Sequence, residues 1–389
     1  MRVESENPVY DSRNNCNAII ETASNTLIRG CKNTIIPNNI KSIGESAFSF
    51  CTSLTSISIP ISVTSEAFTD CTDLTTLFLP TSVESIGGRA FSGCTGLTSI
   101  EFSEGLKKIG DGCFSGCNSL KLVELPKSLK LIGASAFSSC YSIETIFVKD
   151  GNPYYYSPDN SNCIIETASN TLIIGCKNTI IPNGIVTIGN AAFAGCKELS
   201  SIDIPNSVNR IGDSAFSGCS ALSSIDIPNS VYSIGEMAFS ACSSLTSIVL
   251  PSSVSVIHGA VFYHCDNLAS VTIYNCSYFE YQYFSYCPKL KDIYLYMELA
   301  PQVSYNAFTY TDIGNITLHV PASSINTYRT SEPWRSFKEI VEIDMTDNIT
   351  SPVVKNNSGK DIYYNLNGQR EVNPSKGIYI RNGKKIIVR

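Results

Sequence analysis

Cysteine gives this 389-residue sequence its widest choice of chemistry, because thiols bind metals, form disulfides and act as nucleophiles. No CxxC occurs, and the main cysteines recur about 23 residues apart, a spacing unlike that of zinc ligands. Disulfides between neighbouring repeats stay open, since adjacent strands lie within the Cα separation that a disulfide allows. Buried free thiols are the favoured interpretation, because cysteine behaves as a small hydrophobe. Ten of the sixteen cysteines form this series: Cys51, Cys71, Cys94, Cys117, Cys140, Cys196, Cys219, Cys242, Cys265 and Cys287.

Two carboxylates, Asp203 and Asp226, are the strongest catalytic candidates. They occupy equivalent positions in successive repeats, which would bring them about 5 Å apart, near the spacing in retaining glycosidases. The favoured interpretation is two solvated acids on a repetitive face, with cation binding or a glycan-active enzyme as alternatives. His264 stands beside Cys265, but that cysteine belongs to the repeating series, which disfavours a Cys–His nucleophile. No phosphate loop, HExxH or nucleotide fingerprint occurs, and we expect neither a metal site nor a cofactor.

A unit of about 23 residues, repeated eleven times, must position these side chains; a clear copy is AFSGCSALSSIDIPNSVYSIG. Apolar positions written LxxIxI at a period of 20 to 29 residues are typical of a leucine-rich repeat solenoid, in which stacked coils share one core. The repeat phenylalanines are Phe48, Phe68, Phe91, Phe114, Phe137, Phe193, Phe216, Phe239, Phe262, Phe284 and Phe308.

Alternation within one coil predicts which side chains face inward. Leu222, Ile225 and Ile227 should point into the core and Asp226 outward. Pro228 should end the strand, because it lacks the N–H that a ladder needs. The predicted fold is therefore a leucine-rich repeat solenoid of the α/β class, rich in β-structure, with a parallel sheet of 23-residue coils about 4.7 to 4.9 Å apart.

Residues 1–343 are predicted to form this solenoid. Two similar long units, 3–48 and 148–193, match at a constant offset of 145 residues. Each carries Asn, Asp and Ser clusters between short apolar runs, which predicts an inserted β-hairpin. Because the match begins inside a unit, we expect upstream sequence, with an export signal, to precede Val3 in the native protein.

The period breaks near the C-terminus. Residues 320–343 predict an amphipathic cap over the last coil, with the only tryptophan, Trp334, in it. Residues 344–360 predict a polar linker. Residues 361–389 predict a small all-β tail, since two Asn-Gly pairs give hairpin signals.

Outward strand positions are the expected ligand contacts. In the first half of the solenoid they carry apolar side chains beside acids, where other coils have Ser and Thr, and exposed apolar side chains on a strand indicate a partner. The aromatic-rich residues 274–310 leave two interpretations open, a contact surface or an aromatic-filled terminal coil. The candidate ligand-binding residues are Phe78, Glu101, Leu122, Glu124, Phe147, Asp203, Asp226 and Tyr294.

Charge and hydropathy exclude some partners. The net charge is −6, yet the residues from Ser351 onward carry eight Lys or Arg against two acids, which leaves −12 for residues 1–350. This balance disfavours a nucleic-acid partner. No apolar run approaches 18 residues, so no integral membrane span is expected.

The unit AFxxCxxLxxIxIPxSVxxIG, the module NTLIxGCKNTIIP and the cap VPxxSxxxYxxxxxWxxF together resemble the BspA-like leucine-rich repeat family of surface proteins from Gram-negative anaerobes of gut and mouth. The resemblance covers about residues 3–343. It implies a secreted or outer-surface protein, with relatives that act as adhesins for host matrix proteins or partner bacteria. The tail YNLNGQREVNPSKGIYIRNGKKIIVR is similar to C-terminal sorting signals of type IX secretion.

Two function classes follow. The leading one is a monomeric extracellular binding or adhesion module, without enzymatic activity, that recognises a host or bacterial protein or glycan through the solenoid face. The alternative is a glycan-active enzyme that uses Asp203 and Asp226. An enzyme needs a concave pocket with perturbed acids, whereas a binding module needs only an extended face.

Overall fold

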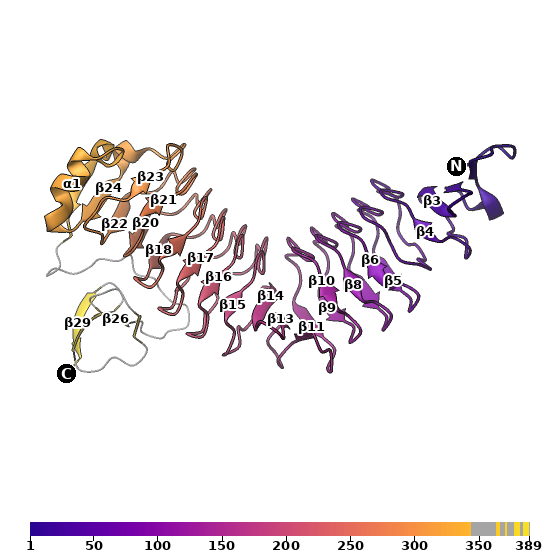
Figure 1. The fold of residues 1–389 in the computed structure, drawn as a ribbon, viewed down its shortest axis with the longest axis horizontal. Coiled ribbons are helices and arrows are strands. Elements are labelled where there is room, and N and C mark those ends of the chain that lie inside the picture. The colour runs from indigo at the N-terminus through magenta and orange to yellow at the C-terminus, as the bar shows by residue number, and fades with distance from the viewer. Residues whose placement is uncertain (344–362, 366–369, 372–376, 382–383, 389) are drawn as a thin grey trace. The chain divides into compact units, whose positions relative to one another are not determined.

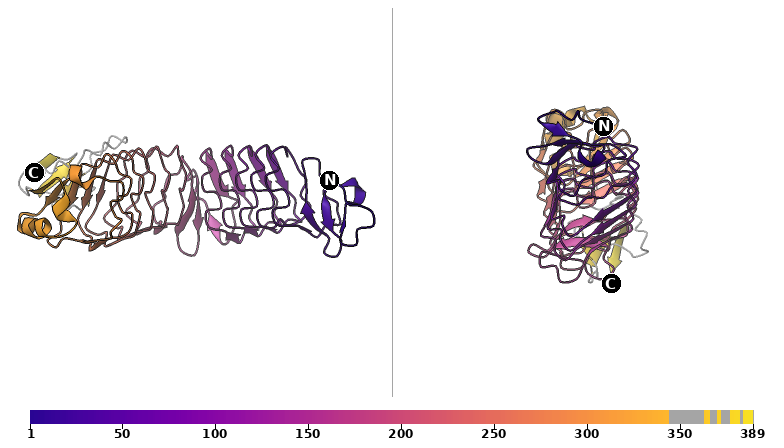
Figure 2. Two further views of the ribbon diagram at one scale, coloured as in Figure 1. Left: turned by 90° about the horizontal axis from the view of Figure 1, so that it is seen from above. Right: turned by 90° about the vertical axis from the view of Figure 1, so that its right-hand side faces the viewer.

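The computed structural model describes residues 1–343, 363–365, 370–371, 377–381 and 384–388. The solenoid residues, 1–343, form about 12 β-solenoid turns with mostly parallel strands (Figures 1 and 2). The predicted repeat solenoid is therefore confirmed. Two compact units divide the chain. Unit 1 comprises Met1–Thr179 and Ala191–Cys196, and unit 2 comprises Ile180–Asn190 and Lys197–Arg389.

The LxxIxI segments supply the longer strands of each unit. In unit 1, β5 pairs with β7 and β9 with β11, all in parallel, while unit 2 has a five-stranded parallel sheet. The strands are β5 (Thr76–Leu79), β7 (Ser99–Phe102), β9 (Leu122–Leu125) and β11 (Thr145–Val148), then β18 (Ser247–Leu250), β20 (Ser270–Ile273), β22 (Asp292–Leu295), β24 (Thr317–Val320) and β25 (Glu339–Glu342).

Three LxxIxI segments form no strand in the described chain, which corrects the expectation of one continuous ladder. Residues 56–59, 201–204 and 224–227 belong to no strand.

A second ladder, not anticipated from the sequence, runs through the SVxxIG segments. Two-residue strands pair in parallel from coil to coil. They are β4 (Ser42–Ile43), β6 (Ser85–Ile86), β8 (Lys108–Ile109) and β10 (Leu131–Ile132) in unit 1, and β15 (Thr187–Ile188), β16 (Arg210–Ile211), β17 (Ser233–Ile234), β19 (Val256–Ile257), β21 (Tyr278–Phe279) and β23 (Gln302–Val303) in unit 2.

The repeat phenylalanines form stacked columns in the core, as predicted. In unit 1 the ring centroids of Phe48 and Phe68 lie 4.8 Å apart, and those of Phe68 and Phe91 lie 5.1 Å apart with nearly parallel planes. In unit 2 the rings of Phe216 and Phe239 stack at 5.5 Å. Stacked aromatic pairs stabilise a fold by more than the burial of their surface alone. Stacking therefore favours one alignment of each coil on its neighbour.

Both long units contain the predicted hairpins, each extended by a third short strand. In the first, β1 (Tyr10–Asp11), β2 (Ile19–Glu21) and β3 (Thr26–Arg29) are antiparallel, with a 3-10 turn η1 (Arg13–Asn15) after β1. In the second, β12 (Tyr155–Tyr156), β13 (Cys163–Glu166) and β14 (Thr171–Gly175) pair in the same way.

The last coils of unit 2 are closed by short helices. They are η2 (Ile313–Asn315), η3 (Ala322–Ser324), α1 (Ile325–Thr330) and η4 (Trp334–Ser336). Tyr328 and Trp334 are fully buried, and the Trp334 indole Nε1 donates to the Pro301 carbonyl at 3.0 Å. No helix among the described residues has the length and apolarity to span a membrane.

The tail contributes four antiparallel strands, β26 (Tyr363–Asn365), β27 (Arg370–Glu371), β28 (Gly377–Arg381) and β29 (Lys384–Val388). The predicted small β tail is thus present. The predicted linker 344–360 lies outside the described residues.

The aromatic segment 274–310, predicted to be either a contact surface or an aromatic-filled coil, contains both buried and exposed rings. Phe279, Tyr283 and Phe284 are buried core residues, whereas Tyr305 and Tyr310 are exposed. The first group forms an aromatic-filled coil, and the second group leaves two aromatic side chains on the surface.

Candidate ligand-binding face

The outward residues of four strands in unit 1 hold most of the predicted ligand contacts. Along β5 the inward side chains Leu77 and Leu79 are buried, while Phe78 between them is 55% exposed. Leu122 at the start of β9 is 48% exposed. Alternation on the strands thus places apolar side chains in solvent, as the sequence predicted.

The strand register aligns four of these residues into a row. Phe78 lies opposite Glu101 in the β5–β7 pair, and Glu124 lies opposite Phe147 in the β9–β11 pair. Strands β7 and β9 are neighbours, so the order is Phe78, Glu101, Glu124, Phe147. We call these four residues the outward row. Leu122 lies beside it, opposite Thr145.

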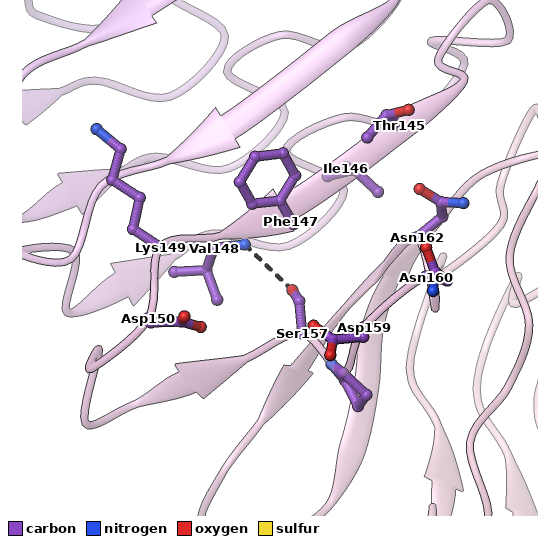
Figure 3. A pocket seen from close by; sticks show the side chains of 11 residues that line it. Thr145, Ile146, Phe147, Val148, Lys149, Asp150, Ser157, Asp159, Asn160 and Asn162 are labelled. Atoms are coloured by element: carbon purple, nitrogen blue, oxygen red, sulfur yellow. Dashed lines mark hydrogen bonds between the residues drawn. The ribbon is translucent and has the colours of Figure 1, made fainter.

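A pocket of about 490 Å³ opens at the Phe147 end of the outward row (Figure 3). Strand β11 forms one wall, and the loop between β12 and β13 forms the other. We call it the hairpin pocket. It is lined by Thr145, Ile146, Phe147, Val148, Lys149, Asp150, Ser157, Pro158, Asp159, Asn160 and Asn162.

Ser157 holds the two walls together. Its Oγ accepts a hydrogen bond from the Val148 backbone N–H at 3.1 Å and donates to the Cys163 carbonyl at 2.7 Å (Figure 3). One hydroxyl therefore bridges the end of β11 and the start of β13. The sequence showed the Ser/Asn/Asp cluster of this loop but gave no sign that it would face Phe147.

The charges around the hairpin pocket are unevenly compensated. The Lys149 ammonium lies 3.4 Å from a Glu124 carboxylate oxygen and 3.6 Å from one of Glu104. Asp150 and Asp159 also line the pocket, and within the described part of the chain their carboxylates make no hydrogen bond or ion pair. The pocket therefore offers two free carboxylates beside a half-buried aromatic ring.

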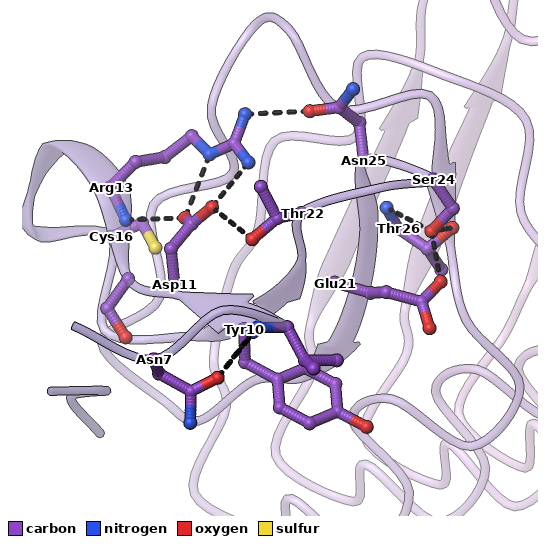
Figure 4. A network of polar contacts seen from close by, with 12 residues as sticks. Asn7, Tyr10, Asp11, Arg13, Cys16, Glu21, Thr22, Ser24, Asn25 and Thr26 are labelled. Carbon is purple, nitrogen blue, oxygen red and sulfur yellow. Dashed lines mark hydrogen bonds and ion pairs between the residues drawn. The ribbon is translucent and has the colours of Figure 1, made fainter. Parts of the chain in front are cut away.

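The same architecture occurs in the first long unit, with different side chains. The Val3 N–H donates to Ser12 Oγ at 2.9 Å, and Ser12 Oγ donates to the Ala18 carbonyl at 2.7 Å, which repeats the Ser157 contacts 145 positions earlier. Arg13, in the place of Pro158, directs its guanidinium to Asp11 and Asn25 (Figure 4). This ion pair lowers the pKa of the Asp11 carboxyl.

The remaining predicted residues lie in unit 2. Asp203 is exposed and Asp226 is half-buried, both in segments outside the strands. Tyr294 on β22 stacks on His319 of β24 with ring centroids 4.0 Å apart, and His319 Nε2 lies 2.9 Å from Asp292 Oδ1. No observation supports the carboxylate-pair enzyme, and no cluster of three metal-ligating side chains occurs among the described residues.

A stack of rings in unit 2, in which Tyr310 is exposed and the other two rings are half-buried, was not predicted from the sequence. His264, Tyr286 and Tyr310 stack at 4.1 and 4.5 Å between centroids, each at a backbone position with φ near +58°. Equivalent positions in other coils are glycine, such as Gly116 and Gly218. The aromatic spacing in the sequence was visible, but its alignment on one edge required the fold.

Comparison with known proteins identifies the family. The BspA type leucine-rich repeat region matches in six copies, over residues 26–144, 61–171, 170–291 and 211–331. The chain belongs to the BspA type leucine-rich repeat family. A search of curated proteins gave no match.

Solved structures agree with this BspA type assignment. A leucine-rich cell surface protein of Faecalibacterium prausnitzii is 29% identical, with a TM-score of 0.59 over 70% of this chain and 73% of that protein. The pneumococcal vaccine antigen PcpA is 24% identical, with a TM-score of 0.67 over 79% and 78%. A leucine-rich repeat protein of Eubacterium ventriosum is 16% identical, with a TM-score of 0.54 over 95% and 96%. The last two show the shared fold.

Proposed function

We propose that this protein is an extracellular binding or adhesion module that recognises its ligand through the outward row of unit 1 and the adjoining hairpin pocket. The observation that carries the proposal is the exposure of Phe78 and Leu122 on a regular strand face. An aromatic or leucine side chain that stays exposed on a strand gains no free energy from burial. Such side chains on a strand face indicate a contact surface.

Folding does not require apolar side chains at these positions. Other coils carry Ser58, Asp203 and Asp226 at the positions equivalent to Phe78 and Phe147, and their inward Ile59 and Ile204 remain buried. The outward side chain is therefore free to vary while the core stays unchanged. This contrast supports selection for binding and not for stability.

The cellular location proposed is secretion or display on the outer surface of a Gram-negative bacterium. The Faecalibacterium relative is described as a cell surface protein, and the tail resembles type IX sorting signals. We expect the protein to act as a monomer, which light scattering on the purified chain will measure.

The test is the double substitution Phe78→Ala with Phe147→Ala, assayed on arrays of matrix proteins and glycans. An aromatic anchor contributes about 2 kcal/mol or more, so capture should weaken roughly 30-fold or more, while the melting midpoint changes little because exposed side chains add little to stability.

The matched control is Leu131→Ala with Tyr232→Ala, which removes side chains that are 48% and 50% exposed elsewhere. Capture should persist in this control. Unchanged capture in the Phe78/Phe147 double variant would remove the outward row from consideration, and a large fall in its melting midpoint would show a structural role instead.

A further inference from the structure

Three hydroxyl side chains on the outward side of the unit 2 sheet are buried. Ser247 on β18 and Ser270 and Thr272 on β20 stand at outward positions, because the strand residues between them belong to the core. Their exposed fractions are only 3%, 6% and 1%. We call the outward positions of the coils in residues 201–341 the unit 2 face.

Neighbouring side chains within the sheet do not explain this burial. Ser247 lies opposite Ser270 in the strand register, and two serines are too small to cover each other. In unit 1 the equivalent pair, Thr76 opposite Ser99, is exposed. The cover over the unit 2 face must therefore come from outside the sheet.

The buried hydroxyls also need hydrogen-bond partners. Within the described part of the chain, Ser270 Oγ and Thr272 Oγ1 are buried and make no hydrogen bond. Burial of an unpaired hydroxyl is destabilising, and proteins rarely leave one unsatisfied. The covering segment should therefore carry polar groups that pair with them.

We propose that the cover is the chain's own basic C-terminal segment, residues 351–389, docked on the unit 2 face. The segment carries eight Lys or Arg against two acids. The unit 2 face, which lies wholly within the described residues, has no Lys or Arg at its outward positions and four acids, Asp203, Asp226, Asp292 and Glu339. This charge complementarity favours docking of the segment.

The segment can reach the unit 2 face. The solenoid ends at β25, the edge strand of the same sheet, three strand spacings from β20. At about 4.8 Å per spacing this distance is about 14 Å, whereas residues 344–360 can extend over about 55 Å. A tethered segment reaches an effective concentration of about millimolar, so it should outcompete a second copy of the chain or a dilute ligand.

Docking assigns a different role to two of the predicted ligand contacts. Asp226 and Tyr294 lie on the unit 2 face, so the segment contacts this part of the solenoid in place of a ligand. The outward row belongs to unit 1, and the proposed function therefore does not depend on the docking.

Such docking changes the melting midpoint little. A tenfold preference for the docked form shifts the midpoint of a chain of this length by about 2 °C or less. Proximity, and not stability, is therefore the quantity to measure.

The experiment is carbodiimide cross-linking, which joins a lysine amine to a carboxylate only where the two are in direct contact. The full chain is treated at low concentration, and cross-linked peptides of the monomer are identified by mass spectrometry. Lys376 and the other lysines of the segment should cross-link to acids of the unit 2 face about 5-fold more often than to the exposed unit 1 acids Asp73 and Glu101. This excess should fall at 0.5 M NaCl, because salt screens charge pairs.

One variant tests the face. Ser270→Arg places a bulky cation at its centre and should reduce these cross-links about 5-fold or more. The control, Ser99→Arg, makes the same change at the equivalent outward position of unit 1 and should leave them unchanged.

A second pair of variants tests the segment. Lys384→Glu with Lys385→Glu should reduce the cross-links of Lys376 to a similar extent, whereas Lys384→Arg with Lys385→Arg keeps the charge and should retain them. Melting midpoints verify folding. If Ser270→Arg melts early, the segment variants decide, because they lie outside the solenoid.

Every other result overturns the inference. Cross-links spread evenly over both units, or unchanged by the Ser270 and Lys384/Lys385 variants, exclude docking on the unit 2 face. An excess on Glu101 and Glu124 shows that the segment covers the outward row instead, and cross-links confined to dimers show that a second copy covers the unit 2 face. The array experiment tests the proposed function separately.

Discussion

At the scale of single residues, the cysteine column acts through backbone contacts between coils. Seven of its thiols donate to the carbonyl oxygen of the repeat phenylalanine one coil earlier, for example Cys71 Sγ to Phe48 at 3.2 Å and Cys242 Sγ to Phe216 at 3.2 Å. Such weak hydrogen bonds are individually small, but the repeat makes them regular. A small side chain with an apolar body and one donor fits this place, which explains why cysteine recurs.

The buried thiols should remain reduced in the folded protein. Burial raises the pKa of Cys196 to about 12 and that of Cys287 to about 12, so at pH 8 these groups are thiols and not the reactive thiolates. We expect slow reaction of most column cysteines with a thiol reagent in native protein. After denaturation without reductant most of the sixteen should react, and a count below half would show disulfides instead.

A left-handed residue in each coil gives a second residue-scale prediction. Ala241 has φ of 56°, where the equivalent Gly218 of the preceding coil has φ of 73°. An L-residue pays about 1–2 kcal/mol in this region, partly offset by the larger unfolded-state entropy of glycine. Ala241→Gly should therefore stabilise the fold by about 0.5–1 kcal/mol, seen as a higher urea midpoint.

The reverse substitution is the control. Gly116 has φ of 75°, and a Cβ there would meet no atom closer than 3.7 Å, so Gly116→Ala should destabilise through backbone strain alone, by about 1 kcal/mol. A lower midpoint for Ala241→Gly, or no loss for Gly116→Ala, would contradict the backbone explanation.

At the scale of elements, the C-terminal helices of unit 2 close an otherwise open coil. The Trp334 ring stacks on Phe337 with centroids 5.4 Å apart and meets Phe308 edge-on at 6.3 Å. In a solenoid each coil contacts only its neighbours. This cluster therefore stabilises the adjacent coils and makes no contact with more distant ones.

Substitution of Trp334 should therefore have a local effect. Trp334→Ala removes a fully buried side chain and should cost about 3–5 kcal/mol, whereas Trp334→Phe should cost less because part of the ring packing remains. Hydrogen exchange should show loss of protection in β22, β24 and β25, with amides of β5 to β9 unchanged. Equal loss in both regions would show global coupling and contradict a local cap.

The two long units show how an element can be duplicated and then diverge. Ser12 and Ser157 make the same bridge in both copies, and Asn7 and Asn152 accept the same pair of backbone N–H groups. The lining side chains differ. The framework contacts are therefore common to both copies, whereas the side chains around them differ.

At the scale of the whole molecule, the tail is expected to serve export and not stability. Its described strands β26 to β29 pair with one another, and the Trp334 cluster already closes the last coil. Truncation after Asp344 should leave the melting midpoint within about 2 °C, because the core of each unit is retained, while export from the native host should fail. The full-length chain is the control, and a large fall in midpoint would mean that the tail stabilises the solenoid.

The sequence by itself determined the period, the stacked columns and the inward and outward alternation. These features depend on local spacing, because a side chain two positions along a strand returns to the same face. It also predicted both hairpins, the exposed Phe78 and Leu122, and the closing tryptophan. Each of these follows from residues a few positions apart or from exact recurrence.

The tertiary structure alone decided which segments meet. The pairing of Phe78 with Glu101 and the gaps in the ladder at 201–204 and 224–227 depend on contacts between coils. The hairpin pocket forms because a hydrogen bond to Ser157 holds its loop against the end of β11. The thiols of the cysteine column donate to carbonyl oxygens about 26 residues earlier, as Cys94 does to Phe68. A one-dimensional pattern specifies which side chains face outward, but not which neighbours share the space outside, since that depends on how successive coils align.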